Sequence, residues 1–118
     1  MECMPFLAIA TNVEVTAQTE EMLLKEASKA VASGTGKPEQ YVLVRITGRQ
    51  PLLFADTDAP AAFMEVKSIG FPANGVKKLA DALCELVTKH LGVPGERTYI
   101  VFEDVKASIW GHDGETFG

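Results

Sequence analysis

The sequence predicts an α/β fold in which two duplicated β-α-β units form one four-stranded mixed sheet with both helices on one face. Strand-like apolar runs and amphipathic helical stretches follow one another in the order strand, helix, strand, and this order occurs twice. The apolar faces of the two helical stretches share a register, since Leu23 and Leu79 stand 79 − 23 = 56 positions apart. A Gly-x-Pro turn follows each helix at the same spacing, at residues 36–38 and 92–94, so an internal duplication explains all three observations.

The two repeats span about residues 5–47 and 61–103, and they fit a single domain covering residues 1–118. The alignment of the two repeats is expected to slip by two residues after the prolines, so that Tyr41 corresponds to Tyr99. Because a helix connects the two strands of each unit, those strands should be parallel and the crossover right-handed.

The first unit opens on a nearly unbroken apolar run at residues 4–12, which is typical of a strand buried on both faces. Pro5 opens this run at the position where a missing backbone N–H costs least. A helix capped by Thr16 is predicted at residues 16–33, and a strand rich in β-forming residues is predicted at 41–46.

The second unit follows a loop rich in proline and aspartate, and Asn74 is a plausible cap for its helix. These elements are a loop at 50–60, a strand at 62–69, a helix at 74–90 and a strand at 98–102. The tail at residues 104–118 is rich in glycine and polar residues, but it contains large apolar side chains that must pack somewhere: Ile109, Trp110 and Phe117.

The predicted sheet has a second face that the two helices cannot cover. The first, second and fourth strands contain apolar residues on both faces, and no further segment of the chain remains to shield them. A self-associating oligomer with its sheet faces turned towards one another is the simplest solution.

Composition excludes several classes of partner. Apolar residues make up 47% of the 118 positions and charged residues 23%, which is the balance of a globular protein. The net charge is 11 − 16 = −5 without a basic cluster, so nucleic acid is not an expected partner. No apolar run approaches the roughly 18 residues of a membrane helix, and no basic region precedes the first apolar run as in a secretory signal. The two cysteines suit a reducing compartment, so we expect a cytoplasmic protein.

Two residues near predicted turns are candidates for chemistry. Pro5 has a structural interpretation as a strand opener and a functional one as a base, because a proline with a free α-nitrogen is a secondary amine. Burial and a nearby cation would lower the pKa of such an amine. Lys37, in a Gly-Lys-Pro turn, is either a solvated loop lysine or the group that holds an anionic substrate.

Other kinds of site find no support in the sequence. His90, His112, Cys3 and Cys84 are the only soft metal ligands, and their spacing matches no zinc pattern. No serine stands in a nucleophile elbow, and no glycine-rich loop of the phosphate-binding kind follows a strand. We therefore expect neither a metal nor a cofactor.

An ordered series of motifs resembles the macrophage migration inhibitory factor family. Any one of these motifs is weak, but together they run from residue 4 to the end in the family's order and spacing. They are Met-Pro-Phe-Leu at 4–7, Thr-Asn-Val at 11–13, Gly-Lys-Pro-Glu-Gln-Tyr-Val at 36–42, Asp-Ala-Pro-Ala at 58–61, Ser-Ile-Gly at 68–70, Gly-Val-Pro at 92–94, Arg-Thr-Tyr-Ile at 97–100 and Gly-Glu-Thr-Phe at 114–117.

The resemblance implies a homotrimer whose sheets enclose a central channel, and a cofactor-free keto–enol tautomerase acting on phenylpyruvate-like or dopachrome-like substrates. It implies that Pro5 is the catalytic base once it is the amino terminus. Lys37 and the backbone at Ile69 would hold the carboxylate of a small aromatic keto or enol acid, and Tyr99 would line the pocket of a neighbouring subunit. Some animal members of the family also act as cytokines.

Several positions depart from the family pattern. An asparagine near the family's site corresponds to Val101, which removes one polar contact. A family Cys-x-x-Cys linked to thiol redox activity corresponds to Ala61 and Met64, so that activity is not expected here. A family Gly-Gly pair in the loop corresponds to Ala55 and Asp56.

The amino terminus separates the alternatives. Residues 1–3 precede Met4, and Glu2 is too large for removal of Met1 by an aminopeptidase. If translation starts at Met4, Pro5 becomes the free base; if it starts at Met1, Pro5 is an amide. A trimeric signalling or interaction protein with a possible protein receptor, exported without a signal peptide, is the second hypothesis. A purely structural domain, which would tolerate loss of Pro5 and Lys37, is the third.

Overall fold

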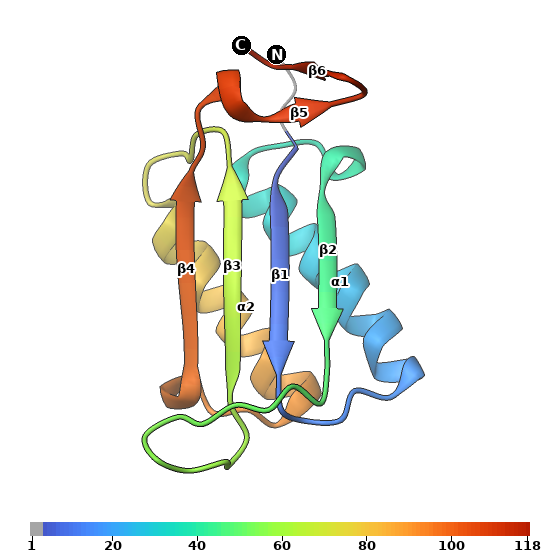
Figure 1. Ribbon diagram of the computed structural model, residues 1–118, viewed down its shortest axis with the longest axis vertical. Coiled ribbons are helices and arrows are strands. Elements are labelled where there is room, and N and C mark those ends of the chain that lie inside the picture. The colour runs from blue at the N-terminus through green and yellow to red at the C-terminus, as the bar shows by residue number, and fades with distance from the viewer. Residues whose placement is uncertain (1–3) are drawn as a thin grey trace.

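A computed structural model describes residues 4–118. It contains the two predicted β-α-β units and a short hairpin at the carboxyl end (Figure 1). The elements are β1 (Phe6–Thr11), α1 (Ala17–Thr35), β2 (Leu43–Thr47), β3 (Ala62–Ser68), α2 (Gly75–Leu91), β4 (Thr98–Asp104), β5 (Gly111–His112) and β6 (Glu115–Thr116).

The sheet is mixed, as the sequence predicts, and its strand order is β2-β1-β3-β4. Within each unit the strands are parallel, because a helix returns the chain to the starting end of the sheet. The two units meet through β1 and β3, which are antiparallel, with Phe6 opposite Lys67 and Thr11 opposite Ala62. This central pair places the start of β1 beside the end of β3.

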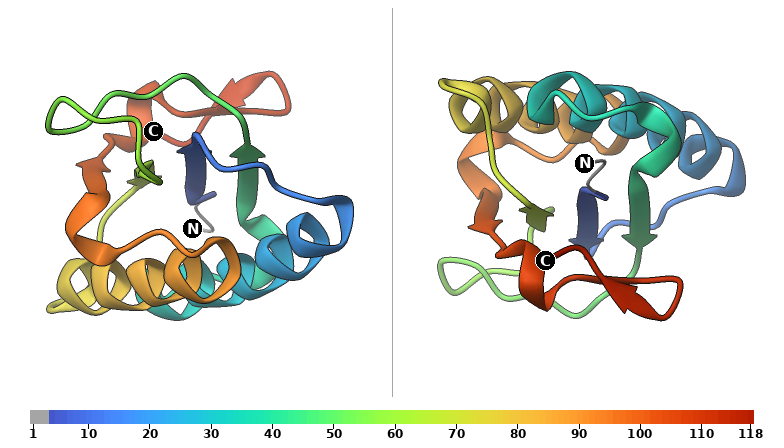
Figure 2. Two further views of the ribbon diagram at one scale, coloured as in Figure 1. Left: turned by 90° about the horizontal axis from the view of Figure 1, so that it is seen from below. Right: turned by 90° about the horizontal axis from the view of Figure 1, so that it is seen from above.

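Both helices cover the same face of the sheet (Figure 2). Along β3 the burial pattern alternates, so one set of side chains enters the core and the other faces away from the helices. The core between the sheet and the helices combines side chains of β1, β3, α1, α2 and the turn after α2, namely Leu7, Ile9, Leu23, Ala27, Val31, Ala62, Met64, Val66, Leu79, Leu83, Val87, Leu91 and Val93.

The helix ends follow the predicted turn chemistry with one exception. The Thr16 hydroxyl accepts a 3.2 Å hydrogen bond from the Thr19 N–H, and Gly36 ends α1 with a left-handed φ of 70°. Asn74 precedes α2 as predicted, but its side chain makes no capping bond. Its backbone is left-handed, with a φ of 63°, whereas a residue that caps a helix through its side chain normally has an extended backbone. The prediction of its position was therefore right, and that of its capping role was wrong.

The predicted slip of two residues between the repeats is also wrong. A 3₁₀ turn at Glu39–Tyr41 precedes β2, and a second at Gly95–Arg97 precedes β4, each directly after a proline. They stand 95 − 39 = 56 positions apart, which is the spacing of the helices, so Tyr41 corresponds to Arg97 rather than to Tyr99. This turn also explains why β2 begins at Leu43 instead of at residue 41.

The outer face of the sheet, turned away from the helices, is more polar than the sequence pattern suggested. Arg45, Glu65 and Lys67 point outwards between exposed apolar residues such as Leu43 and Val101. At one end of this face lies the carboxyl-terminal hairpin, and at the other lies the loop between β2 and β3 (Figure 2). Ile109, expected to pack, is 71% exposed within the single chain. In the part of the chain described, no helix has the length and apolar character needed to cross a membrane.

Candidate active site

Pro5 lies directly before β1, and its side chain is less than 2% exposed. Its carbonyl accepts a 3.0 Å hydrogen bond from the Leu43 N–H, which fixes the residue beside the edge strand β2. Proline suits this position because a strand can begin without the missing donor. In the chain described here, Met4 precedes Pro5, so the Pro5 nitrogen is an amide.

Lys37 lies at the same end of the sheet, in the turn from α1 to β2 (Figure 1). Its backbone N–H donates to the Ala32 carbonyl at 3.2 Å, and the residue follows the left-handed cap Gly36. Lys37 is half-buried, and its ammonium forms no ion pair within the described residues. The turn therefore leaves a cation beside the start of β1.

Ile69 also lies at this end, immediately after β3. Phe6 pairs with Lys67, so continuing the antiparallel register by two residues brings Ile69 opposite Met4 and Ser68 opposite Pro5. Pro5, Lys37 and Ile69 thus come from the start of β1, the end of α1 and the end of β3, and the fold gathers them at one end.

Ser68 is a feature of this end that the sequence did not reveal. It is fully buried, and its hydroxyl has no hydrogen-bond partner among the described residues, whereas most buried polar groups are paired. Only the register of β1 and β3 places this hydroxyl beside Pro5, so no local motif could have indicated it.

Tyr99 lies at the opposite end of the sheet from Pro5. It is the second residue of β4 and pairs with Phe63, five residues before Ser68 along β3. At about 3.3 Å per residue this separation is about 17 Å, so Tyr99 and Pro5 of one chain cannot share a site. Tyr99 is 63% exposed, on the outer face.

A cavity of about 600 Å³ opens on the outer face near the Pro5 end. Arg45 and Lys67 line it with two cations against the single carboxylate of Glu103, and Trp110 and Ile109 of the carboxyl-terminal segment form its far wall. The Arg45 guanidinium lies 5.8 Å from the centre of the Phe6 ring. The sequence reasoning did not single out Arg45 or Lys67, because alternate residues of separate strands meet only once the register is known.

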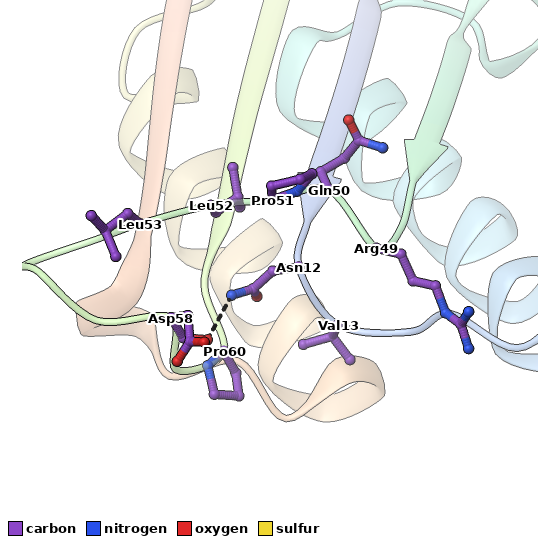
Figure 3. Close-up of a pocket in the computed structure, with 9 residues that line it drawn as sticks. All are labelled: Asn12, Val13, Arg49, Gln50, Pro51, Leu52, Leu53, Asp58 and Pro60. Carbon is purple, nitrogen blue, oxygen red and sulfur yellow. Dashed lines mark hydrogen bonds between the residues drawn. The ribbon is translucent and has the colours of Figure 1, made fainter.

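A larger hollow of about 760 Å³ lies at the other end, under the loop between β2 and β3 (Figure 3). The Asn12 amide lies within it, donating to the Asp58 and Ala59 carbonyls at 3.0 Å each, while the Asn12 Oδ1 accepts from the Ala61 N–H at 2.9 Å. Arg49 points away from Asn12. Asn12 thus holds the loop in place through three hydrogen bonds to its backbone.

The remaining candidates lie away from this site. Burial, and secondarily the charge of Asp81, raises the pKa of the Cys84 thiol, which is the state of an inert packing residue. His90 is directed at Glu26 between the helices, with 3.0 Å separating Nε2 from Oε2. Within residues 4–118, no group of three or more histidine, cysteine, aspartate or glutamate side chains could hold a metal ion.

Comparison with known proteins identifies the family. The sequence pattern of the family described as macrophage migration inhibitory factor (MIF) matches residues 4–118. The chain belongs to the MIF family. The MIF homolog of Trichuris trichiura is 40% identical to it over 115 residues, covering 97% of this chain and 100% of the relative. MIF of Xenopus laevis is 36% identical over 117 residues, covering 97% and 99%.

Solved MIF structures share the fold. A MIF homologue from Prochlorococcus marinus superimposes with a TM-score of 0.90 at 36% identity, covering 96% of this chain and 99% of that one. MIF of Toxoplasma gondii gives a TM-score of 0.89 at 36% identity, covering 95% and 99%. The fold class predicted from the sequence is therefore confirmed. Ala61 and Met64 are both buried, and Val101 is exposed on the outer face.

Proposed function

We propose that the protein is a cofactor-free keto–enol tautomerase acting on phenylpyruvate-like or dopachrome-like substrates, with Pro5 as its base. The observation that carries the proposal is the burial of Pro5 at the start of a central strand, at the end of the sheet where Lys37 and Ile69 also lie. Membership of the MIF family supports it, because the family match begins at Met4, one residue before this proline.

The proposed reaction moves one proton and needs no redox partner. The Pro5 nitrogen takes the hydroxyl proton of the enol as the C–O bond becomes a carbonyl, and the electron pair of the C=C bond then takes that proton at the α-carbon. Lys37 and the backbone N–H of Ile69 hold the substrate carboxylate. The apolar surroundings of Pro5 and the cation of Lys37 are expected to lower the pKa of a free Pro5 amine, which favours the neutral base near pH 7.

The active form is proposed to be a homotrimer in which Tyr99 serves the site of a neighbouring subunit. Two observations support this arrangement. Tyr99 lies at the far end of its own sheet from Pro5, and the outer face leaves Leu43, Tyr99 and Val101 exposed without a covering layer.

The proposal is tested on a chain that begins at Pro5, with phenylpyruvate as substrate. Pro5→Gly should abolish turnover, since glycine supplies a primary amine without the ring. Lys37→Ala should mainly raise KM, because it removes a carboxylate contact made by substrate and transition state alike. Lys78→Ala, an exposed lysine on α2, is the matched control and should behave like the wild type. Undiminished turnover by Pro5→Gly would refute the proposal.

A second candidate function applies to a chain in which residues 1–4 still precede Pro5, because the Pro5 nitrogen is then an amide. A trimer that keeps residues 1–4 has no free proline and would act as a cytokine-like signalling or interaction protein towards a protein receptor. It would carry out this role outside the cell after export without a signal peptide, whereas the enzyme would work in the cytoplasm.

A further inference from the structure

The Arg97 side chain fastens the loop that precedes β3 to the start of β4. Its Nε donates to the Pro60 carbonyl at 2.9 Å, and its Nη1 donates to the Phe54 carbonyl at 3.0 Å. Its Nη2 donates to the carbonyls of Thr57 and Ala59 at 3.1 and 3.0 Å. One guanidinium thus binds four backbone oxygens, and only its planar set of five donors permits this.

Phe54 lies between the Arg97 guanidinium and Tyr99 and contacts both. The Arg97 Cζ lies 5.1 Å from the centre of the Phe54 ring, and the centres of the Phe54 and Tyr99 rings are 4.8 Å apart with their planes inclined at 56°. Thr98, the first residue of β4, is buried, so the next residue, Tyr99, projects to the outer side of the sheet. The three side chains therefore form one contact chain in which Phe54 fixes the Tyr99 ring.

A small hollow of about 190 Å³ lies beside this chain, lined by Leu53, Phe54, Ala55 and Tyr99. None of its four lining residues is charged, and two of them, Phe54 and Tyr99, are aromatic. Aromatic rings attract one another in tilted and edge-to-face arrangements, and an alkyl group lacks this attraction. The lining therefore suits an aryl ring better than an alkyl chain of similar size.

We propose that Phe54 determines the preference for aryl over alkyl side chains of the substrate, and that Arg97 is the residue that positions it. This inference rests on the proposed function, in which Tyr99 reaches the site of a neighbouring copy. There Tyr99 brings Phe54 and Leu53 with it, so the hollow that they line adds an aromatic surface to the neighbouring site. The aryl end of a bound substrate then meets Phe54.

The test compares phenylpyruvate with 4-methyl-2-oxopentanoate, an alkyl 2-oxo acid, on chains that begin at Pro5. Phe54→Leu should raise KM for phenylpyruvate about tenfold, because the tilted ring contact is lost. It should leave kcat, and both constants for the alkyl acid, within about twofold, because the reacting atoms lie elsewhere. Phe54→Tyr keeps the ring and should retain the wild-type preference. Phe54→Leu conserves apolar volume, and urea unfolding of each variant confirms that it is folded.

The Arg97→Lys variant tests whether Arg97 positions Phe54 or only stabilises the fold. Lysine cannot bind four carbonyls, so the preference for phenylpyruvate should fall as in Phe54→Leu while the KM for the alkyl acid stays constant. Arg49→Lys is the matched control, since Arg49 is exposed and its side chain, within residues 4–118, pairs only with Glu14. A purely structural Arg97 would change the kinetic constants of both acids equally.

Equal KM changes for both acids in Phe54→Leu, or no change for either, would overturn the inference. If the wild type converts neither acid, the proposed function has failed, and equilibrium binding of cinnamate and crotonate then decides the inference. These acids cannot tautomerise at an α-keto group and differ by the aryl ring. The wild type should bind cinnamate more tightly and Phe54→Leu should lose that preference; the same preference in both proteins would contradict the assignment of Phe54.

Discussion

The imidazole Nε2 of His90 lies 3.0 Å from Oε2 of Glu26, so the last turn of α2 contacts the middle of α1. The neighbouring Lys89 Nζ lies 3.1 Å from Oε1 of the same carboxylate. The neighbouring His90 side chain, followed by that of Lys89, lowers the pKa of Glu26 below its usual value of 4.5. One carboxylate thus joins the two helices that cover the sheet.

Replacing Glu26 by glutamine should lower the free energy of unfolding at pH 7. A carboxyl group whose pKa is lower in the folded chain stabilises the fold above its unfolded pKa, and this contribution is lost as the pH falls through the lowered value. The difference between wild type and Glu26→Gln should therefore shrink below about pH 4.5. Urea unfolding at pH 7 and pH 3 measures it. Glu21→Gln, which removes an exposed pair with Lys25, is the control, and an equal effect of both variants would contradict the prediction.

Two buried strand hydroxyls should respond in opposite ways to removal. The Thr11 hydroxyl donates to the Ala61 carbonyl at 2.7 Å and accepts from the Val13 N–H at 3.2 Å, whereas the Ser68 hydroxyl has no partner among the described residues. Thr11→Val removes the partner of a buried carbonyl and of a partly buried N–H, and should cost about 1–3 kcal/mol of unfolding free energy. Ser68→Ala should leave that free energy unchanged or raise it. Chemical denaturation of both variants checks this, and a larger loss in Ser68→Ala would show that its hydroxyl is paired in solution.

Replacing Ala55 or Asp56 by glycine should stabilise the turn that these two residues form. Both residues have a left-handed φ, of 53° and 62°, between Phe54 and Thr57, whose backbones exchange two hydrogen bonds. Alanine tolerates this region poorly and aspartate somewhat better. Ala55→Gly is expected to raise the free energy of unfolding by about 1 kcal/mol, and Asp56→Gly by less. Ala73→Gly, at an exposed turn residue without positive φ, should instead be neutral or destabilising. Destabilisation by Ala55→Gly would show that the turn is not strained.

Much of the fold could be predicted because hydrophobic periodicity records which faces are buried. The stripe containing Leu23 and its counterpart Leu79 indicated both helices and their common face. The predictions were wrong at positions where the backbone conformation, rather than the type of side chain, determines the local structure. The 3₁₀ turns that align Tyr41 with Arg97 leave no periodic signal, and Asn74 enters α2 through a left-handed conformation instead of a side-chain cap.

The candidate site was predictable only in part. Pro5, Lys37 and Ile69 meet at one end because β1 and β3 are antiparallel, and the resemblance supplied their roles. No sequence pattern indicates a role for Phe54, because its contact with Tyr99 joins a loop to a strand far along the chain. The Arg97 contacts are with backbone oxygens, which every residue has, so no sequence pattern distinguishes them.

The close approach of α1 and α2 explains why residue 75 is a glycine, which the internal repeat does not explain. A Cβ at Gly75 would lie 2.7 Å from the Gly34 carbonyl oxygen, so the start of α2 can touch the end of α1 only without a side chain. This contact lies at the same end of the helix layer as the turn carrying Lys37.

In the proposed mechanism, a free Pro5 amine carries out the proton transfer. The most direct measurement compares phenylpyruvate tautomerisation by two preparations of the protein, one beginning at Pro5 and one retaining residues 1–4, each verified by intact mass and amino-terminal sequencing. We expect turnover by the first preparation and none by the second, because the second has an amide in place of the base. Equal activity in both, or none in the chain that begins at Pro5, would contradict it.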